Sequence, residues 1–290
     1  MTPLWTPAPR LWSGRALLSM IVNDTPTPVL NSTTADGRNE EIRFDIPGWS
    51  KLTVFSLWGG EDGEIVAGGN GFNAQGNPSG FIERISGDRA GRAPMPLDAI
   101  SIAVMTVGPG GMLWAIGIGK DKETDTFHSN ILVRLSPDGK LLSSTILDFP
   151  RINDSDNVNR SSQMRASSDR VGWLTSRNQY IEFAADGHEI TRIDGPPGSS
   201  SNDVSNSRLA ITQGNTVLVS KPAPEGRNQP QKTNIWTLDR IKDRWFLSEA
   251  ADGTFPANTS IYGFDGVTLI TSGASKAGQL LVRYHLSETK

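Results

Sequence analysis

The sequence predicts an all-β fold made of repeated units of four short strands, and three observations lead to this fold class. Its apolar runs are short and are separated by turns rich in glycine, proline and Asp-Gly pairs, as in GPGGMLWAIG and SPDGKLL. No long stretch shows the 3.6-residue periodicity of an amphipathic helix. The same strand and turn pattern also recurs along nearly the whole chain. These features favour many short antiparallel strands over helices.

The stretch 110–150 defines the repeating unit. Ile131, Val133 and Leu135 share one face of an expected strand, because side chains alternate along a strand with a period of two. The turn Ser-Pro-Asp-Gly at 136–139 then reverses the chain into a third run that ends near Leu147. The unit therefore contains a hairpin joined by a Pro-Asp-Gly turn.

Six copies of this unit can be aligned along the chain. The equivalent positions are Leu30, Ile82, Leu132, Ile181, Ile235 and Leu281, and subtraction gives successive spacings of 52, 50, 49, 54 and 46 residues. A period near 50 residues that holds about four strands is typical of β-propeller blades. We therefore expect a β-propeller of six blades, each with four antiparallel strands named A to D from the inside outward. Five or seven blades are also compatible with the repeats.

The repeats span residues 1–290, which predicts a single propeller domain. The last copy has strands A, B and C but no D, so the ring is expected to close by pairing of N- and C-terminal segments. Residues 10–12 are one source of the missing strand, and in the alternative they belong to the first unit. The run Ala16–Val22 faintly resembles the apolar part of a signal peptide, but it lies about one period before Ile65 and is interpreted as strand B of the first unit. Trp58, Trp114, Trp173 and Trp236 are expected to pack between blades.

Composition excludes several classes of function. Lys and Arg number 28 against 31 Asp and Glu, the net charge is −3 and the signs are interspersed, so no nucleic-acid partner is expected. The absence of cysteine excludes disulfides, thiolate metal sites and cysteine nucleophiles. No apolar run is long enough for a membrane-spanning helix, so no membrane insertion is expected. An extracytoplasmic or secreted location is expected if a signal segment precedes this numbering.

The expected loops divide between the two ends of each blade. The A–B and C–D turns are short, whereas the B–C inserts 68–79, 120–130 and 223–233 and the D–A links 150–162 and 196–207 are long and polar. We call the end that carries the long loops the B–C/D–A face and the opposite end the A–B/C–D face. Function in repeat folds tends to lie on the face with the insertions. The insert 68–79 lacks the context of a phosphate-binding loop and is interpreted as a flexible loop.

The D–A link RINDSDNVNR at 151–160 is the strongest candidate site, since its carboxylate and amide oxygens are ligands that calcium uses. It departs from an EF-hand loop, so turns that bond their own backbone are favoured over a metal. The polar link SSSNDVSN follows one blade later, and three scattered histidines make no metal set. The candidate ligand-binding residues are Asp154, Asp156, Asn157, Asn159, Asn202, Asp203 and His128. No cofactor is expected, and Ca²⁺ or another divalent metal is the alternative, with Asp154 and Asp156 as its ligands.

The unit Leu113-Trp114, polar insert, ILVRL at 131–135 and Asp138-Gly139 resembles the blades of NHL-type and SMP-30/gluconolactonase-like propellers. Lactonases of that kind hold a divalent metal over the central channel, but no residue of this chain is matched to their ligands and no catalytic residue is assigned. The leading hypothesis is a non-enzymatic propeller that binds a protein, peptide or glycan through the B–C/D–A face. The alternative is a metal-dependent hydrolase of lactones or esters. A sensor or assembly domain is a third reading, which no linker or coiled-coil segment supports.

Overall fold

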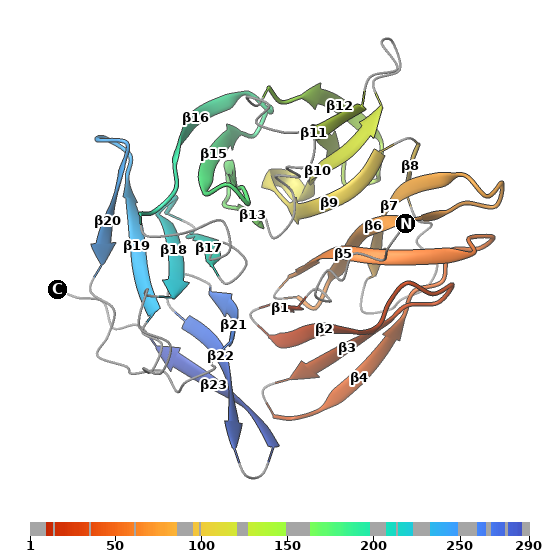
Figure 1. Cartoon of the computed structure of the whole chain (residues 1–290), viewed down its shortest axis with the longest axis horizontal. Helices are drawn as coiled ribbons and strands as arrows, with labels where there is room; N and C mark the ends of the chain where they lie inside the picture. Colours follow the sequence, from red (N-terminus) through yellow and green to blue (C-terminus); the bar gives the residue numbers. More distant parts are fainter. Residues whose placement is uncertain are drawn as a thin grey trace. The chain divides into compact units, whose positions relative to one another are not determined.

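The structure is a computed structural model of the whole chain (Figure 1). The residues that it describes are 10–13, 15–34, 36–60, 62–85, 95–98, 100–120, 127–148, 163–197, 207–212, 214–222, 233–248, 260–264, 268–275 and 278–285. Contacts divide the chain into unit 1, residues 1–107 and 111–160, and unit 2, residues 108–110 and 161–290. The single-domain assignment stays a prediction.

Unit 1 contains three four-stranded antiparallel sheets, each a meander in which consecutive strands are neighbours (Figure 1). Blade 1 consists of β1 (Arg10–Trp12), β2 (Ala16–Val22), β3 (Val29–Thr34) and β4 (Asn39–Arg43). Blade 2 consists of β5 (Lys51–Gly59), β6 (Ile65–Phe72), β7 (Pro78–Ile85) and β8 (Met95–Asp98). Blade 3 consists of β9 (Ile100–Val107), β10 (Leu113–Lys120), β11 (Phe127–Leu135) and β12 (Leu141–Ile146), with a 3₁₀ turn (Pro109–Gly111) before β10.

Unit 2 repeats this meander twice and then forms a three-stranded sheet. Blade 4 consists of β13 (Gln163–Ala166), β14 (Arg170–Leu174), β15 (Gln179–Ala184) and β16 (Glu189–Asp194). Blade 5 consists of β17 (Arg208–Ile211), β18 (Val217–Pro222), β19 (Thr233–Asp239) and β20 (Arg244–Ser248). The last sheet consists of β21 (Ser260–Phe264), β22 (Thr268–Ser275) and β23 (Gly278–His285).

The predicted β-propeller of four-stranded antiparallel blades is confirmed, but the predicted number of six such blades is wrong. Five sheets have four strands, and the sixth repeat forms the three-stranded sheet of β21 to β23. The segment Arg10–Trp12 does not supply a fourth strand to that sheet, because it is β1 and pairs with β2 in blade 1. Closure of the ring by the two chain ends stays a prediction. The interpretation of Ala16–Val22 as strand B of the first unit is confirmed by β2.

The Asp-Gly pairs form the C–D turns that the sequence predicts. Gly37, Gly139 and Gly187 have φ angles of 84°, 88° and 99°, a region that side chains disfavour and glycine adopts freely. In two of these turns the amides of Gly139 and Gly187 donate 2.9 Å hydrogen bonds to the carbonyls of Ser136 and Ala184. These turns fix where strand D begins in blades 1, 3 and 4.

Two expected loops of the B–C/D–A face are strands instead. The stretch 68–79 was expected to be a flexible insert, but β6 and β7 form a hairpin closed by a short turn at 73–77. Its glycines allow close approach of neighbouring backbone, since a Cβ on Gly80 would lie 1.8 Å from the carbonyl oxygen of Ile100. His128 was expected in a loop, and it lies in β11 opposite Gly119. The β6–β7 ladder runs regularly from Ile65 to Phe72, and the β10–β11 ladder continues to Lys120 after a register shift between Gly117 and Gly119.

The cores lie where sheets of neighbouring blades face each other. Leu30 of blade 1 and Leu52 of blade 2 belong to one cluster, and Ile82 of blade 2 and Val133 of blade 3 belong to the next. In unit 2, β14, β15, β17, β18 and β19 contribute a third cluster. Burial of these aliphatic side chains provides the main favourable free energy of folding.

The expected packing of tryptophan between blades is confirmed for Trp58 and stays a prediction for Trp114, Trp173 and Trp236. Trp114 and Trp173 are completely buried, Trp58 packs against the core of blades 2 and 3, and Trp236 is half-buried. Among the residues described, no helix is long and apolar enough to cross a membrane.

Candidate functional site

Most of the predicted ligand-binding residues fall outside the described part of the chain. These are Asp154, Asp156, Asn157, Asn159, Asn202 and Asp203. His128 has a described backbone in β11. Their role in binding therefore stays a prediction, and the described residues around them provide the geometry of the candidate site.

A buried lysine holds the start of the D–A link that follows blade 4. Lys221, at the end of β18, is only 2 % exposed, and its ammonium group donates 2.9 Å hydrogen bonds to Oδ1 of Asn178 and to the carbonyl oxygen of Pro196. Asn178 lies in the B–C turn of blade 4 and donates from Nδ2 to the same Pro196 carbonyl at 3.1 Å. We call Lys221, Asn178 and Pro196 the Lys221 cluster. It joins a turn and a link of blade 4 to blade 5 on the B–C/D–A face.

The local backbone explains why these three residues meet. Asn178 has a φ of 58°, a left-handed conformation that asparagine tolerates better than most residues, and this conformation completes the tight turn from β14 to β15. Gly195 follows β16 and leaves room for the side chain of Asn178, because a Cβ there would lie 2.5 Å from Oδ1 of Asn178. The ammonium of Lys221 then occupies a position where carbonyl oxygens replace water, as a buried cation requires.

The far end of the same link is held by a second buried contact. Gln163, at the start of β13, donates from Nε2 to the carbonyl oxygen of Ser207, and its Oε1 accepts a 3.0 Å hydrogen bond from the amide of Leu209. Ser207 is fully buried. The link between Pro196 and Ser207 is therefore anchored at both ends, and it is the link that carries the predicted residues Asn202 and Asp203.

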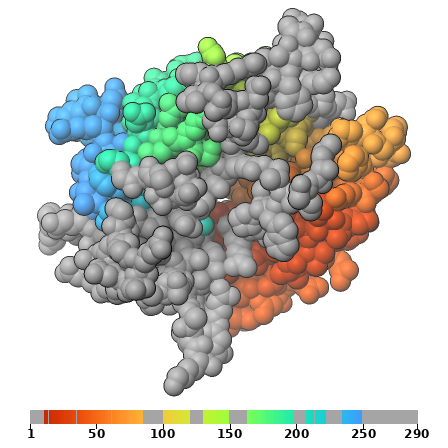
Figure 2. All heavy atoms as spheres, in the orientation of Figure 1, coloured from red at the N-terminus to blue at the C-terminus, as the bar shows by residue number. Residues whose placement is uncertain are grey.

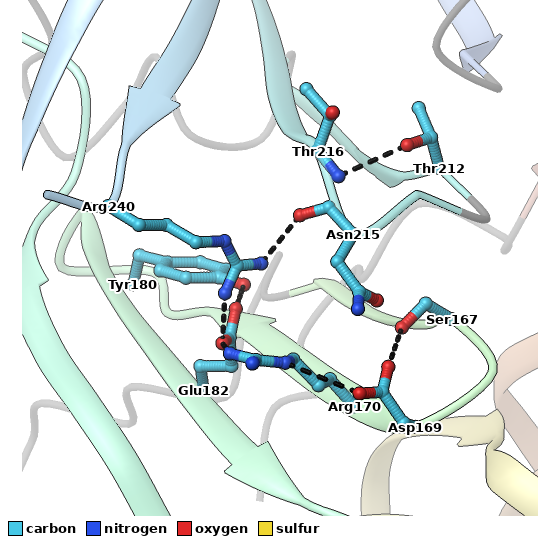
Figure 3. A network of polar contacts seen from close by, with 9 residues as sticks. All are labelled: Ser167, Asp169, Arg170, Tyr180, Glu182, Thr212, Asn215, Thr216 and Arg240. Carbon is cyan, nitrogen blue, oxygen red and sulfur yellow. Dashed lines mark hydrogen bonds and ion pairs between the residues drawn. The ribbon is translucent and has the colours of Figure 1, made fainter.

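A second polar cluster of unit 2 surrounds Glu182 on the A–B/C–D face (Figure 3). The fully buried carboxylate accepts a 2.7 Å hydrogen bond from Nη1 of Arg170 and a 2.6 Å hydrogen bond from the hydroxyl of Tyr180. Arg240, which follows β19, donates to the same carboxylate and donates from Nη2 to the carbonyl oxygen of Asn215 at 2.7 Å. We call Arg170, Tyr180, Glu182 and Arg240 the Glu182 cluster. It ties β14 and β15 of blade 4 to two turns of blade 5.

The charge states of the Glu182 cluster favour a structural role over catalysis. Burial alone would raise the pKa of Glu182, but hydrogen bonds from Arg240, Tyr180 and Arg170 outweigh it and keep this pKa below its ordinary value. Burial, and then the negative charge of Glu182, raises the pKa of Tyr180 well above its ordinary value. A buried tyrosine that stays protonated is a hydrogen-bond donor and not a nucleophile. The cluster therefore stabilises the contact between two blades.

The position of Glu182 is occupied by arginine in two blades of unit 1. Glu182 lies opposite Gly172, the third residue of β14, and Arg84 and Arg134 lie opposite Val66 and Trp114, the second residues of β6 and β10. The C–D turn opens at Ala184 in blade 4 and at Ser136 in blade 3. Glu182 and Arg134 each lie two residues before that opening residue.

The arginines at this position make contacts of a different kind. Arg84 forms an ion pair of 3.1 Å with Glu64 and donates from Nη2 to the carbonyl oxygen of Gly111 in blade 3 at 2.6 Å. Arg134 places its guanidinium carbon 4.8 Å from the ring centre of Trp114, a cation–π contact. Arg84 thus connects blade 2 to blade 3, as Glu182 connects blade 4 to blade 5, with the opposite sign of charge.

Neither polar cluster of unit 2 was predicted from the sequence. The signal for Glu182 is a charged residue inside the apolar run YIEF, and the signal for Lys221 is a lysine directly after the run VLVS. Both residue types are rarely buried unless they are paired, so their positions inside strands were informative.

Unit 1 has a half-buried acidic side chain with a shifted pKa. Burial, and then the charge of Asp45, raises the pKa of Glu83 to about 7, and Oε2 of Glu83 has no hydrogen-bond partner. Among the described residues, no three His, Cys, Asp or Glu side chains are placed to hold a metal ion. Glu83 is therefore a half-buried titrating group without a defined ligand.

Comparison with known proteins identifies the fold. Neither a protein-family model nor a curated protein sequence matches the chain. A protein of unknown function from Bacteroides caccae is 12 % identical with a TM-score of 0.52, and the match covers 93 % of this chain and 90 % of that one. BBS1N, in a complex with ARL6DN, is 12 % identical with a TM-score of 0.50 over 99 % and 80 % of the two chains. Trypanosoma rangeli sialidase, in complex with the inhibitor DANA, is 11 % identical with a TM-score of 0.48 over 95 % of this chain and 54 % of that one. At these identities the similarity concerns the fold alone.

Proposed function

We propose that this chain is a non-enzymatic β-propeller that binds a protein, peptide or glycan through its B–C/D–A face. The observation that supports this most directly is the anchoring of the link 196–207 at both ends, by Lys221 at Pro196 and by Gln163 at Ser207. A loop with fixed ends loses less conformational entropy when it binds a ligand, so anchoring favours affinity. A rigid base also holds the binding groups of a loop in a defined place.

The chemistry of the described residues agrees with binding better than with catalysis. The phenol and both guanidinium groups of the Glu182 cluster already donate hydrogen bonds to its carboxylate. Glu182 and Tyr180 are also completely buried. A substrate would have to break this network before it reached a reactive atom. The proposed binding residues are the ones predicted on the links, Asn202 and Asp203 first and then Asp154, Asp156, Asn157 and Asn159.

The neighbouring fold BBS1N is named in a complex with ARL6DN, which makes a protein or peptide ligand the first class to test. Selection of random twelve-residue peptides by phage display, with a glycan microarray in parallel, supplies the probes. A selected probe should lose roughly tenfold or more of its affinity when Asn202 and Asp203 are both changed to Ala. The matched control is His188→Ala on the opposite A–B/C–D face, which should leave affinity unchanged. Loss of binding with the control and not with the link variant would contradict the proposal.

The metal-dependent hydrolase, and with it the resemblance to SMP-30/gluconolactonase-like propellers, stays a separate prediction. It is distinguished by a thermal melt of chelator-treated protein with and without Ca²⁺, Zn²⁺ or Mn²⁺, because a ligand of the native state stabilises it by mass action. A metal-specific rise that disappears in Asp154→Ala with Asp156→Ala, together with hydrolysis of a lactone, would replace the binding proposal.

A further inference from the structure

Two arginines lie on the innermost strands of neighbouring blades of unit 2. Arg165 is the third residue of β13 in blade 4, and Arg208 is the first residue of β17 in blade 5 (Figure 1). The two blades lie side by side, with the green and teal atoms of 163–197 next to the blue atoms of 233–248 (Figure 2). Because each strand A begins at the B–C/D–A face, both residues lie close to the face that is proposed to bind the ligand. We call Arg165 and Arg208 the inner arginines.

Each inner arginine bonds the main-chain carbonyl of the residue before it. Nη1 of Arg165 donates to the carbonyl oxygen of Met164 at 2.8 Å, and Nη1 of Arg208 donates to the carbonyl oxygen of Ser207 at 2.7 Å. The Ser207 carbonyl also accepts a hydrogen bond from Gln163 of blade 4. The same arrangement thus occurs in two consecutive blades.

The ladder of blade 4 shows where the guanidinium group of Arg165 lies. The amide of Ser167 bonds the carbonyl of Arg170, and the register between β13 and β14 has no shift. Hydrogen-bonded pairs of an antiparallel ladder recur at every second residue, so Arg165 bonds β14 and the carbonyl of Met164 points away from β14. The guanidinium group that bonds this carbonyl therefore lies at the inner edge of the blade.

Arg165 has no acidic partner among the described residues. Its side chain is half-buried, and the Met164 carbonyl is the acceptor of its described hydrogen bond. Burial alone lowers the pKa of Arg165 to about 10, so the group is still charged at pH 7. Other described arginines have a carboxylate or an aromatic ring as partner, namely Arg84, Arg134, Arg170, Arg192 and Arg240.

A half-buried guanidinium group without a carboxylate has the chemistry of an anion-binding group. It presents five N–H donors in a planar fork that matches the two oxygens of a carboxylate. Removing a cation from water is costly unless an anion or several acceptors replace the water. A carboxylate from a ligand would supply both the opposite charge and the acceptors.

Lys221 adds a third cationic side chain beside the inner arginines. Ser220 lies opposite Arg208 in the ladder of β17 and β18, and Lys221 is the next residue of β18. Its ammonium group bonds two uncharged acceptors, the Asn178 side chain and the Pro196 carbonyl. Cationic groups gathered in one place raise the local positive potential and so favour an acidic ligand.

We propose that the ligand of the B–C/D–A face is an acidic peptide and that Arg165 binds one of its carboxylates through the guanidinium fork, with Arg208 as the second cation. This inference rests on the proposed function and adds the charge of the ligand. A peptide fits better than an acidic glycan, because the N–H and C=O groups of Met164 and Ala166 point to the same inner edge as Arg165. Main-chain groups of this kind bond the main chain of an extended peptide.

The first test uses the peptides that phage display selects from a random twelve-residue library. They should be enriched in Asp and Glu relative to the library. Changing every Asp and Glu of a selected peptide to Asn and Gln should lower its affinity by about tenfold or more in fluorescence anisotropy. Peptides that bind equally well as amides would overturn this inference and leave the proposed function intact. Binding of array glycans without binding of any peptide would also overturn it.

Variants of the protein test the assigned residue. Arg165→Met keeps the apolar stem and should weaken the acidic peptide by about tenfold or more, while the amide version binds as before. Arg165→Lys keeps the charge without the fork and should recover part of the loss. Arg192→Met removes an arginine of the outer strand β16 and is the matched control, which should bind like wild type.

Thermal unfolding separates ligand binding from a structural role of Arg165. Arg165→Met removes a half-buried cation that has no acidic partner among the described residues, so its unfolding temperature should equal or exceed that of wild type. A lower unfolding temperature together with unchanged affinity would assign Arg165 to the fold and overturn the inference. An equal loss of affinity in Arg192→Met would overturn it as well.

Discussion

Nη1 of Arg170 lies 2.7 Å from Oε1 of Glu182, and this ion pair joins a half-exposed guanidinium to a completely buried carboxylate. Removing one partner of a buried pair leaves an uncompensated charge in the core. Glu182→Gln should therefore destabilise the protein by about 3 kcal/mol at pH 7, measured as a loss of unfolding free energy in urea. Glu189→Gln breaks the more exposed pair with Arg192 and should cost less than about 1 kcal/mol. Equal losses in the two variants would contradict the role of Glu182.

The stability that Glu182 contributes should disappear in acid. Its folded pKa is below the ordinary value of 4.5, so the unfolded chain takes up the proton first as pH falls. The contribution is complete above pH 4.5 and is lost as pH falls toward the folded pKa. The difference between wild type and Glu182→Gln, measured in urea at several pH values, should therefore narrow below pH 4.5. A difference that stays constant down to pH 3 would show that the carboxylate charge is not its source.

Glu83 should give the opposite pH dependence. Its pKa is raised to about 7 in the folded protein, so the folded state binds the proton more tightly than the unfolded state does. Its protonation favours the folded state below pH 4.5, and this advantage is lost as pH rises through 7. Glu83→Gln should raise stability relative to wild type by about 2 kcal/mol at pH 8.5 and change it little at pH 4.5. Thermal unfolding across this range checks the prediction, and Glu41→Gln on the exposed strand β4 should show no such trend.

Lys221→Met should loosen the D–A link of blade 4 more than it unfolds the protein. Methionine keeps most of the apolar stem but gives no donor to Asn178 or to the carbonyl of Pro196. Two buried acceptors lose a partner, at a cost of about 1 to 3 kcal/mol. Hydrogen exchange at the amides of Asp194 and Gly195 should speed up, while exchange in β10 stays slow. Lys242→Met, which changes an exposed lysine, should change neither.

Gly80 should tolerate no side chain. A Cβ at this position would lie 1.8 Å from a backbone oxygen of β9, which can move only if two strands of neighbouring blades separate. Gly80→Ala should cost about 3 kcal/mol or more in urea unfolding. Gly214→Ala, where the nearest atom is 3.9 Å away, should be nearly neutral and serves as the control. Similar stabilities of the two variants would show that β9 can shift at small cost.

The strands and turns could be predicted because their causes are local. Asp-Gly turns and alternating apolar runs are visible in the sequence itself, and Ala16–Val22 and the run Ile131–Leu135 lie in strands as expected. The number of blades could not be predicted in the same way. Six repeats were counted correctly, but a repeat does not reveal how many of its strands pair, and the sixth forms a sheet of three.

The Glu182 cluster was missed because the alignment of blade 4 was one residue out of register. Ile181 was aligned with Leu132, yet Asp186 of the turn follows Ile181 by five residues and Asp138 follows Leu132 by six. A slip of one residue exchanges the two faces of a strand, so Glu182 was matched to Val133 and not to Arg134. Counting back from the Asp-Gly turn would have matched Glu182 of blade 4 with Arg134 of blade 3.

The partners of Lys221 and Gln163 could not be identified from the sequence, because they are distant in the chain. Asn178 precedes Lys221 by 43 residues, and Ser207 follows Gln163 by 44. A lysine in a strand is usually exposed. Only the folded arrangement of blades 4 and 5 supplies the carbonyl oxygens that allow its burial.

The opposite charges of Arg84 and Glu182 at one blade position make the blades unequal as building blocks. Repeat proteins change length by duplicating or recombining whole units, and such events succeed most easily when every unit fits every neighbour. A copy of blade 2 inserted before blade 5 would bring Arg84 against Arg240, two guanidinium groups without a carboxylate. A copy of blade 4 inserted before blade 3 would direct the carboxylate of Glu182 toward the carbonyl of Gly111. A blade moved to another place in the order would therefore lose the partner of its charged residue, which disfavours exchange of the blades.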